Sequence, residues 1–429
     1  MKATPSTRTT PVTHHRTVQV NGLDVFYREA GSPDAPTLVL LHGAPASSFM
    51  FRDLIPRLAR QYHVLAPDLI GFGSSSAPSV SEFDYSFDRL TDITAGFLSQ
   101  LGVDRYALYV QDYGAPVGWR LALRNPQQVT AIITQNGNAY QEGFVDSFWA
   151  PLWRYAKDRT PENAAPLLDA LSLEKIHWQY THGVPDASVV SPDTWLHDHA
   201  LVNRPGNPEV QLALFADYPT NVTLYPAVHE YFRSSQVPLL AVWGRNDEIF
   251  GEAGARAFTR DLPAAEVHLL DGGHFLLESR LDQATELIED FLGRTLRPDD
   301  RTDPASLYAL GEEFRAAQTA QDPVRLRALL HDEVEWVLPG DNAVSGTARG
   351  IDSIFERFAA MAGYGLDIHI EHVTAGRDAV ALILHNTGHQ GDRVLDEHLV
   401  STLALRDGKI VRIETYLTDI DMMNAYFTR

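Results

Sequence analysis

Cysteine is absent from the 429-residue sequence. Its absence excludes disulfide bonds, thiolate metal ligands and a cysteine nucleophile. The sequence also lacks any apolar run close to the roughly 20 residues that a membrane-spanning helix needs. Positive charge is scarce, because 35 Lys and Arg stand against 56 Asp and Glu, for a net charge of −21. Nucleic acids and anionic membranes call for a basic surface, so we expect a small-molecule partner and a cytoplasmic protein.

The chain is longer than a typical domain of about 100–200 residues. Its first residues, MKATPSTRTTPVTHHR, are polar and rich in Pro and Thr, and they lack the apolar segment of a signal peptide. We predict a flexible tail over residues 1–15. A charged, proline-containing stretch predicts a linker at 296–304, which would divide the chain into two domains.

The first domain alternates apolar runs with helical stretches. Continuous apolar runs such as 36–43 and 106–111 are typical of strands that are covered on both faces. The alternation over 16–137 predicts an α/β fold with a doubly wound, mostly parallel sheet. Residues 138–235 break the pattern with aromatics, prolines and helical patches, which predicts a helical cap. The sheet pattern resumes over 236–295, so the cap should cover the carboxyl ends of the strands, where such folds bind ligands.

The second domain has a different order of elements. Residues 305–429 begin with helical stretches and end with consecutive alternating strands. Helices followed by an antiparallel meander indicate a separate α+β domain.

Three reactive side chains each follow an apolar strand of the first domain: Asp112, Asp247 and His274. Because the carboxyl ends of parallel strands meet at one edge of a sheet, we expect the three to cluster. Their order along the chain is that of an α/β-hydrolase triad, with Asp where esterases have Ser. No acid follows the 129–137 strand, where Asn136 stands instead, and this favours Asp247 as the acid. The alternatives are a helix cap at Asp112, a turn residue at Asp247 and a packed core histidine.

An aspartate nucleophile predicts a particular chemistry. A carboxylate attacks an sp3 carbon directly and forms an alkyl-enzyme ester. His274 would then activate the water that hydrolyses the ester, with Asp247 orienting its ring. The backbone N–H groups of Tyr113 and Ala44 are the candidate oxyanion donors. This scheme uses neither a metal nor a cofactor.

Five motifs carry a family resemblance: LLHGAPASSFMFRDLIPRL, VLAPDLIGFGSS, VQDYGAPVGWRLAL, VWGRNDEIFG and DGGHFLLES. In this order they resemble the epoxide hydrolase and haloalkane dehalogenase branch of the α/β hydrolases, over residues 16–295. The resemblance implies Asp112 as nucleophile, His274 as base, Asp247 as its partner and a cap over 138–235.

The two activities of this branch differ in how the leaving atom is stabilised. Tyr218 is similar in placement to the distal cap tyrosine of epoxide hydrolases, and Tyr155 and Tyr140 are candidates for the second tyrosine. We therefore expect an epoxide hydrolase.

Two features leave haloalkane dehalogenation as the alternative. Val110, two residues before the nucleophile, and Trp153, which resembles a dehalogenase cap tryptophan, both point to it. The residues at Tyr113 and Ala44 argue against it, because dehalogenases place halide-binding Trp and Asn side chains there. A non-catalytic small-molecule binding protein is an alternative of another class.

Residues 305–429 resemble a SnoaL-type domain, which is cone-shaped and related to nuclear transport factor. The resemblance implies an apolar pocket and a homodimer formed through the open sheet face. We expect His385, His389 and His398 to bind no metal, because they fall on different strands or turns. The candidate polar groups of the pocket are Trp336, His369, His385, His398, Tyr416 and Asp419.

Overall fold

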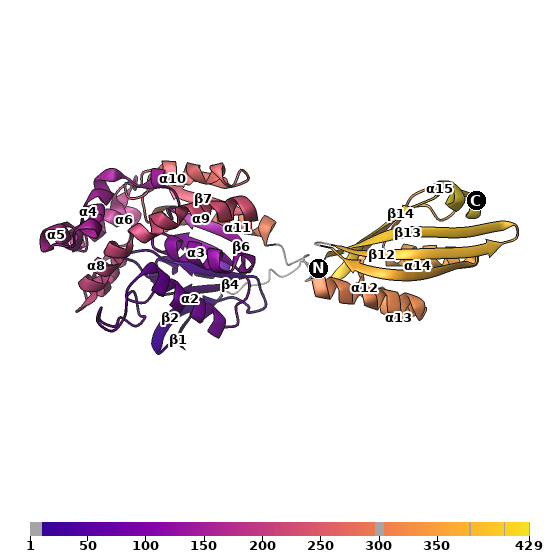
Figure 1. The fold of residues 1–429 in the computed structure, drawn as a ribbon, viewed down its shortest axis with the longest axis horizontal. Helices are drawn as coiled ribbons and strands as arrows, with labels where there is room; N and C mark the ends of the chain where they lie inside the picture. Colours follow the sequence, from indigo (N-terminus) through magenta and orange to yellow (C-terminus); the bar gives the residue numbers. More distant parts are fainter. Residues whose placement is uncertain (1–10, 297–303, 377–378, 407, 429) are drawn as a thin grey trace, which may run out of the picture. The chain divides into compact units, whose positions relative to one another are not determined.

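The computed structural model describes residues 11–296, 304–376, 379–406 and 408–428, and Figure 1 shows its fold. The chain divides into two compact units, Met1–Leu296 and Arg297–Arg429. Residues 1–10 of the predicted tail and 297–303 of the predicted linker lie outside the described residues. No helix in the described part of the chain is long and apolar enough to cross a membrane.

The first unit contains an eight-stranded sheet in the order β1-β2-β4-β3-β5-β6-β7-β8. β1 and β2 form an antiparallel hairpin whose turn, Asn21 and Gly22, has φ values of 51° and 83°. The strands from β4 to β8 pair in parallel. The bounds are β1 (His14–Val20), β2 (Leu23–Ala30), β3 (Thr37–Leu41), β4 (His63–Pro67), β5 (Tyr106–Gln111), β6 (Val129–Gln135), β7 (Leu239–Gly244) and β8 (Glu266–Leu270).

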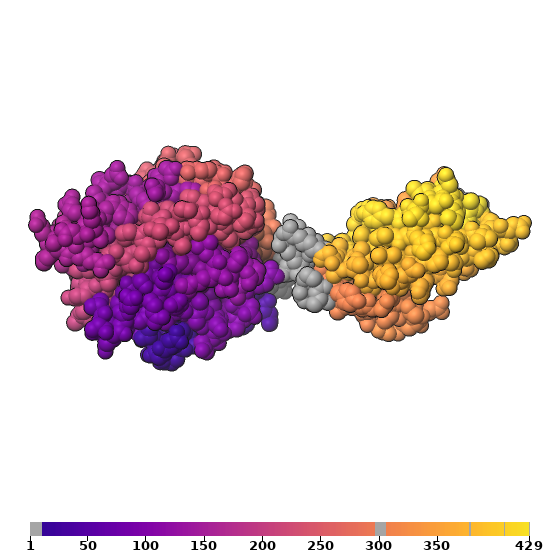
Figure 2. Space-filling model, in the orientation of Figure 1, coloured from indigo at the N-terminus to yellow at the C-terminus, as the bar shows by residue number. Residues whose placement is uncertain are grey.

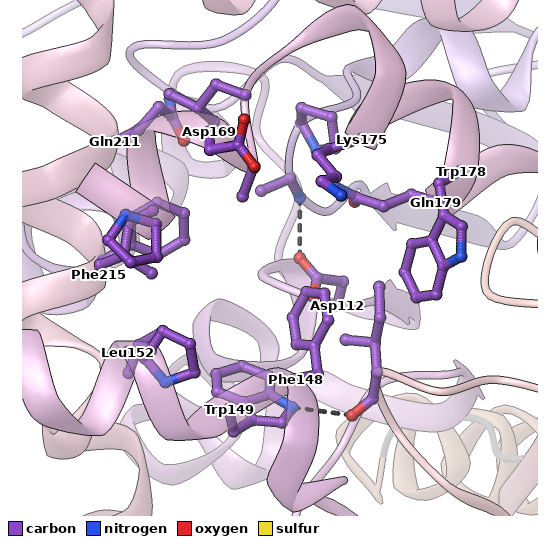
Figure 3. Close-up of a pocket in the computed structure, with 18 of the residues that line it drawn as sticks. Asp112, Phe148, Trp149, Leu152, Asp169, Lys175, Trp178, Gln179, Gln211 and Phe215 are labelled. Atoms are coloured by element: carbon purple, nitrogen blue, oxygen red, sulfur yellow. Dashed lines mark hydrogen bonds between the residues drawn. The ribbon is translucent and has the colours of Figure 1, made fainter. Parts of the chain in front are cut away.

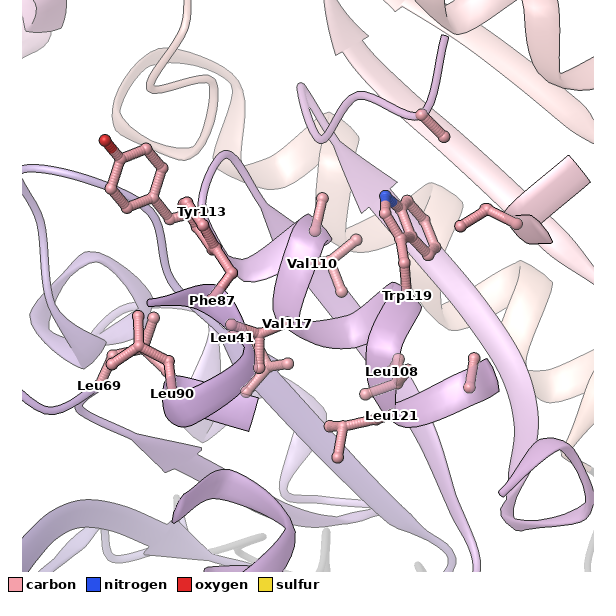
Figure 4. Close-up of a cluster of buried hydrophobic side chains, with 14 of the residues drawn as sticks. Leu41, Leu69, Phe87, Leu90, Leu108, Val110, Tyr113, Val117, Trp119 and Leu121 are labelled. Atoms are coloured by element: carbon pink, nitrogen blue, oxygen red, sulfur yellow. The ribbon is translucent and has the colours of Figure 1, made fainter. Parts of the chain in front are cut away.

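Helices cover both faces of this sheet, because successive side chains of a strand point to opposite sides. On β3, Leu41 faces the core formed with α2 (Phe87–Gln100) and α3 (Gly114–Arg124), and Figure 4 shows part of this cluster. Leu40 faces the other core, which contains side chains of α1 (Ile55–Leu58) and α11 (Leu277–Thr295). The predicted doubly wound α/β fold is confirmed.

Between β6 and β7 the chain forms the helical cap. In Figure 1, helices α4, α5, α6 and α8 gather at one end of this unit, and in Figure 2 residues of this segment form the surface there. The cap helices are α4 (Asp146–Lys157), α5 (Pro161–Asp169), α6 (Leu173–Thr181), α7 (Pro192–Val202), α8 (Asn207–Asp217) and α9 (Pro219–Ser235).

The second unit is an α+β domain with a six-stranded sheet in the order β10-β9-β14-β13-β12-β11. Side chains of α12 and α14 form a core with one face of the sheet. Two elements were not predicted, the short strand β10 and the terminal helix α15. The bounds are α12 (Pro304–Thr319), α13 (Pro323–Leu329), β9 (Leu330–Leu338), β10 (Gly346–Arg349), α14 (Ile351–Gly363), β11 (Leu366–Ala375), β12 (Ala379–Gln390), β13 (Arg393–Arg406), β14 (Lys409–Leu417) and α15 (Ile420–Tyr426).

Candidate active site

Asp112 lies on a strained turn between β5 and α3. Its φ is +46°, in the left-handed region that few non-glycine residues adopt. Two glycines make the turn possible. A Cβ on Gly114 would lie 2.1 Å from the carbonyl oxygen of Leu41, and one on Gly43 would lie 2.3 Å from the Asp112 Cβ. Asp112 is not the N-cap of α3, because Tyr113 occupies that position.

The Asp112 carboxylate is held by backbone donors. Its Oδ1 accepts a hydrogen bond of 2.8 Å from the N–H of Ala44. The N–H of Tyr113 also donates to the carboxylate. Burial raises the pKa of Asp112 above its usual value. The two N–H groups and the positive charge of His274 oppose this shift. Oδ1 is therefore held by the N–H of Ala44, while Oδ2 lies on the side of His274.

His274 and Asp247 form the second half of the predicted cluster. His274 Nδ1 lies 2.9 Å from Asp247 Oδ2, and His274 Nε2 lies 4.0 Å from Asp112 Oδ2. Burial alone would lower the pKa of His274, but attraction to Asp247, their hydrogen bond and the Asp112 charge together raise it. The structure thus brings together the three side chains that the strand ends predicted.

Asn136 is a part of the site that the sequence analysis missed. Its Nδ2 donates to Asp247 Oδ2 at 2.6 Å, and its Oδ1 accepts from the N–H of Gly244 at 2.9 Å. The other Asp247 oxygen accepts from the N–H of Ile249 at 2.7 Å. In the sequence Asn136 counted only as the absence of an acid, although an Asn at a strand end, able to adopt its positive φ of 49°, was a signal.

Gln111, directly before the nucleophile, is the second residue that was missed. It is fully buried, and its Nε2 lies 2.8 Å from His274 Nε2. Nε2 of the ring therefore lies between the Gln111 amide and the Asp112 carboxylate, while Nδ1 faces Asp247.

A cavity of about 430 Å³ lies between Asp112 and the cap helices. Figure 3 shows Phe148, Trp149 and Leu152 on one side of Asp112 and the polar groups of the cap on the other. The polar groups that line the cavity besides Asp112 and Tyr113 include Asp169, Lys175, Gln179 and Gln211. Most of the remaining lining is apolar, as for a small-molecule site.

The three cap residues predicted for the pocket, Tyr218, Trp153 and Tyr155, are not among the residues that line this cavity. Tyr218 is buried behind its wall, with ring centroids 4.5 Å from Trp149 and 5.8 Å from Tyr113. Burial raises the pKa of Tyr218 well above its usual value, and the Asp112 charge contributes. Trp153 packs against Trp149, with ring centroids 5.5 Å apart.

A third tyrosine, Tyr113, lies against Tyr218, with ring centroids 5.8 Å apart. Tyr113 lines the cavity, and its buried hydroxyl has no hydrogen-bond partner among the described residues. The Tyr140 hydroxyl instead donates a hydrogen bond of 2.9 Å to Asp261 Oδ2. Burial and the charge of Asp112 raise the pKa of Tyr113 well above its usual value, so the hydroxyl keeps its proton.

The second unit has a small cavity of about 50 Å³ on the apolar face of its sheet. Trp336 lines it as predicted, and the Trp336 indole donates to Thr415 Oγ1 at 3.0 Å. The remaining candidates do not line it. Four of them are strand residues on the face that points away from the helices, and Asp419 is the N-cap of α15, where its side chain accepts from the N–H of Met422. Those candidates are His369, His385, His398, Tyr416 and Asp419.

His385 and His398 lie side by side on that other face. They are direct partners of β12 and β13, with ring centroids 4.1 Å apart. With Glu371 they place three potential ligand atoms within 4.8 Å of one another. His385 and His398 do fall on different strands, as predicted, but these strands are neighbours and bring the two rings together. The prediction that the histidines bind no metal stays a prediction.

The comparisons with known proteins agree with this fold. Residues 36–281 match the family described as alpha/beta hydrolase fold, and residues 312–413 match the SnoaL-like domain. The chain belongs to the alpha/beta hydrolase fold family and carries a SnoaL-like domain at its C-terminal end.

The relatives fall in the branch that the motifs indicated. The chain is 44% identical to "Uncharacterized hydrolase YNR064C" of Saccharomyces cerevisiae over 277 residues, 64% of this chain and 95% of that protein. It is 29% identical to a haloalkane dehalogenase of Mycolicibacterium paratuberculosis, over 62% of this chain and 86% of the relative. It is 41% identical to Epoxide hydrolase A of Mycobacterium tuberculosis, over 27% and 36% respectively. The structure of haloalkane dehalogenase DbeA of Bradyrhizobium elkani shares the fold, with a TM-score of 0.56, 24% identity and 67% and 100% coverage.

Proposed function

We propose that the first unit is an epoxide hydrolase that works through a covalent ester on Asp112. The observation that carries the proposal is the geometry of three side chains. Asp112 stands on a strained elbow, and the His274–Asp247 pair faces its free oxygen at 4.0 Å. A histidine in this position serves the hydrolysis of an ester, because a carboxylate nucleophile needs no base.

In the first step Asp112 Oδ2 attacks an epoxide carbon. A carbon–oxygen bond forms as the ring carbon–oxygen bond breaks, and the epoxide oxygen takes a proton. Tyr113 supplies this proton, with the neutral Tyr218 packed against it. Both hydroxyls are protonated near neutral pH, because burial raises the pKa of each.

In the second step His274 removes a proton from water, and the resulting hydroxide attacks the Asp112 carbonyl carbon. Negative charge then develops on Oδ1, which already accepts from Ala44. When the tetrahedral intermediate collapses, the bond from the carbonyl carbon to Oδ2 breaks, and the released alkoxide takes the proton from His274 to give the diol. The water oxygen stays in the new Asp112 carboxyl group, whose remaining proton restores the Tyr113 hydroxyl. Ester formation itself prepares this step, since it removes the Asp112 charge that raises the pKa of His274.

A haloalkane dehalogenase is the second candidate, supported by the 29% identical relative of that name, which aligns over 62% of this chain. Halide departure needs N–H donors. The indole of Trp149, which lines the cavity, already donates to the carbonyl of Ile249 at 2.8 Å. Tyr113 offers a hydroxyl where a tryptophan would offer an N–H, and this favours an oxygen leaving group.

Trapping of the ester tests the proposal. His274→Ala, incubated with styrene oxide-type epoxides and separately with bromoalkanes, should gain the mass of the whole epoxide on Asp112. Asp112→Asn should gain nothing. His268→Ala is the matched control, because this histidine lies on the adjacent β8 outside the cavity and should keep full turnover. An adduct from bromoalkanes alone would establish the dehalogenase. If neither compound formed an adduct, the proposal of an enzyme would be overturned in favour of a non-catalytic binding protein.

A further inference from the structure

Gln211 is the one fully buried amide in the cavity wall that the proposed chemistry does not use. It lies on α8 of the cap and is 0% exposed. Neither its Nε2 nor its Oε1 has a hydrogen-bond partner among the described residues. Buried amides in folded proteins are paired in the great majority, and an unpaired one costs stability. Two open hydrogen-bonding positions on one side chain therefore need an explanation.

The position of Gln211 supplies that explanation. It lines the cavity that contains Asp112. Its neighbours on α8, Val210 and Leu214, are buried in the apolar core, and Asn207, one turn earlier, uses its Nδ2 on the carbonyl of Val202. Lys175 and Asp169 also line the cavity but are exposed, and Lys175 lies 4.0 Å from the Glu174 carboxylate. Gln211 is therefore a buried polar group on the cap side of the pocket, in addition to the Tyr113 hydroxyl that the proposed chemistry uses.

We infer that Gln211 forms a specificity subsite for a neutral substrate group that both donates and accepts a hydrogen bond, such as a hydroxyl or a carboxamide. The inference rests on the proposed function, because it adds a substrate class to the same cavity. An amide matches such a group with its NH2 and its carbonyl oxygen. An anionic group is disfavoured, because the Asp112 carboxylate lines the same cavity. The apolar walls fit the body of the molecule between its reactive end and this group.

A matched pair of substrates tests the subsite. Terminal epoxyalkanes of increasing chain length are compared with ω-hydroxy analogues in which a hydroxyl replaces the last methyl group. The wild-type protein should prefer the hydroxy analogue by about 10-fold or more in kcat/KM at one chain length, since a site built to hydrogen-bond a hydroxyl rejects the molecule that lacks it. In Gln211→Leu this preference should vanish, because kcat/KM falls for the hydroxy analogues and stays unchanged for the epoxyalkanes.

Thermal unfolding separates a binding role from a structural one. Gln211→Leu and Gln211→Met should raise Tm, because each removes an unpaired buried amide. A lower Tm with equal losses on both series would make Gln211 structural and overturn the inference. Gln179→Leu, a partly exposed glutamine of the same cavity, should keep the hydroxyl preference.

The subsite can fail independently of the proposed function. If His274→Ala forms an ester but the wild-type protein shows no hydroxyl preference at any chain length, the subsite is wrong and the hydrolase stands. If no ester forms, the subsite is measured by titrating wild-type protein and Gln211→Leu with the diols of both series. Equal affinities for the two diols would overturn it, and a preference confined to the wild-type protein would support it.

Discussion

Asn136 and His274 hydrogen-bond to the same oxygen of Asp247. Asn136 Nδ2 lies 2.6 Å and His274 Nδ1 lies 2.9 Å from Asp247 Oδ2. A hydrogen bond to a charged group contributes about 1.5–3 kcal/mol. We therefore expect Asn136→Ala to slow ester hydrolysis by roughly 10- to 100-fold, because the Asp247 carboxylate is less firmly held.

Rapid-quench kinetics check this prediction. Asn136→Ala should form the ester at close to the wild-type rate and accumulate it, since Asn136 touches only the half of the site that serves the second step. Equal slowing of both steps would contradict the prediction and indicate a general loss of the fold around β6.

The charge of Asp112 reports directly on His274. Because that charge is among the causes that raise the pKa of His274, Asp112→Asn should lower it. The pKa of His274 should also be lower in the ester intermediate than in the free enzyme, because Asp112 is neutral there as well. Titration of the His274 ring by NMR in the wild-type protein and Asp112→Asn measures the shift.

The rate of ester hydrolysis should show the same effect. It should rise with pH as His274 loses its proton, with a midpoint below the pKa of His274 in the free enzyme. An unchanged pKa in Asp112→Asn, or a midpoint above that of the free enzyme, would show that the two residues are not coupled.

The catalytic cluster could be predicted from the sequence, because the carboxyl ends of parallel strands meet at one sheet edge whatever the strand order. That rule, together with the order of nucleophile, acid and histidine along the chain, pointed to Asp112, Asp247 and His274. The cap has no such rule. Its helices are placed by packing, so the sequence could not tell that Tyr218 would lie behind the cavity wall and Gln211 inside it.

The second unit illustrates a different limit. The alternation of its strands was visible, but which set of residues faces the helices depends on the register of each strand. The three histidines that pair across neighbouring strands were therefore assigned to the pocket, although they lie on the opposite face of the sheet. They are His369, His385 and His398.

Gly43 should tolerate no side chain. A Cβ there would lie 2.3 Å from both Asp112 Cβ and Gln111 Oε1. Overpacking of a buried position costs about 1–3 kcal/mol, and relief by moving the Asp112 side chain would misplace the nucleophile. Gly43→Ala should therefore lose at least about 100-fold in kcat/KM and also in ester formation by the His274→Ala background.

A matched glycine gives the control for this prediction. A Cβ on Gly293, within α11, meets no atom within 4 Å, and a helical alanine is favoured over glycine. Gly293→Ala should keep activity and match or slightly exceed the wild-type Tm. Full activity in Gly43→Ala would contradict the tight contact at the elbow.

Tyr113 should contribute more than Tyr218 to the rate of ester formation from an epoxide, because Tyr113 lines the cavity and Tyr218 does not. Tyr113→Phe removes the hydroxyl that protonates the leaving oxygen, and general acid catalysis contributes typically 10²–10⁴-fold. Ester formation from an epoxide should fall by about that factor, whereas a bromoalkane, whose leaving group needs no proton, should be affected far less. Tyr218→Phe should have a smaller effect on the epoxide, since its ring packing against Tyr113 is preserved.

The measurement is the rate of ester formation with the epoxide divided by the rate with the bromoalkane, followed by intact mass in the His274→Ala background. This ratio isolates proton donation from changes in binding. A larger loss in Tyr218→Phe would reverse the assignment and make the cap tyrosine the donor, and equal losses on both substrates would mean that Tyr113 shapes the cavity without donating a proton.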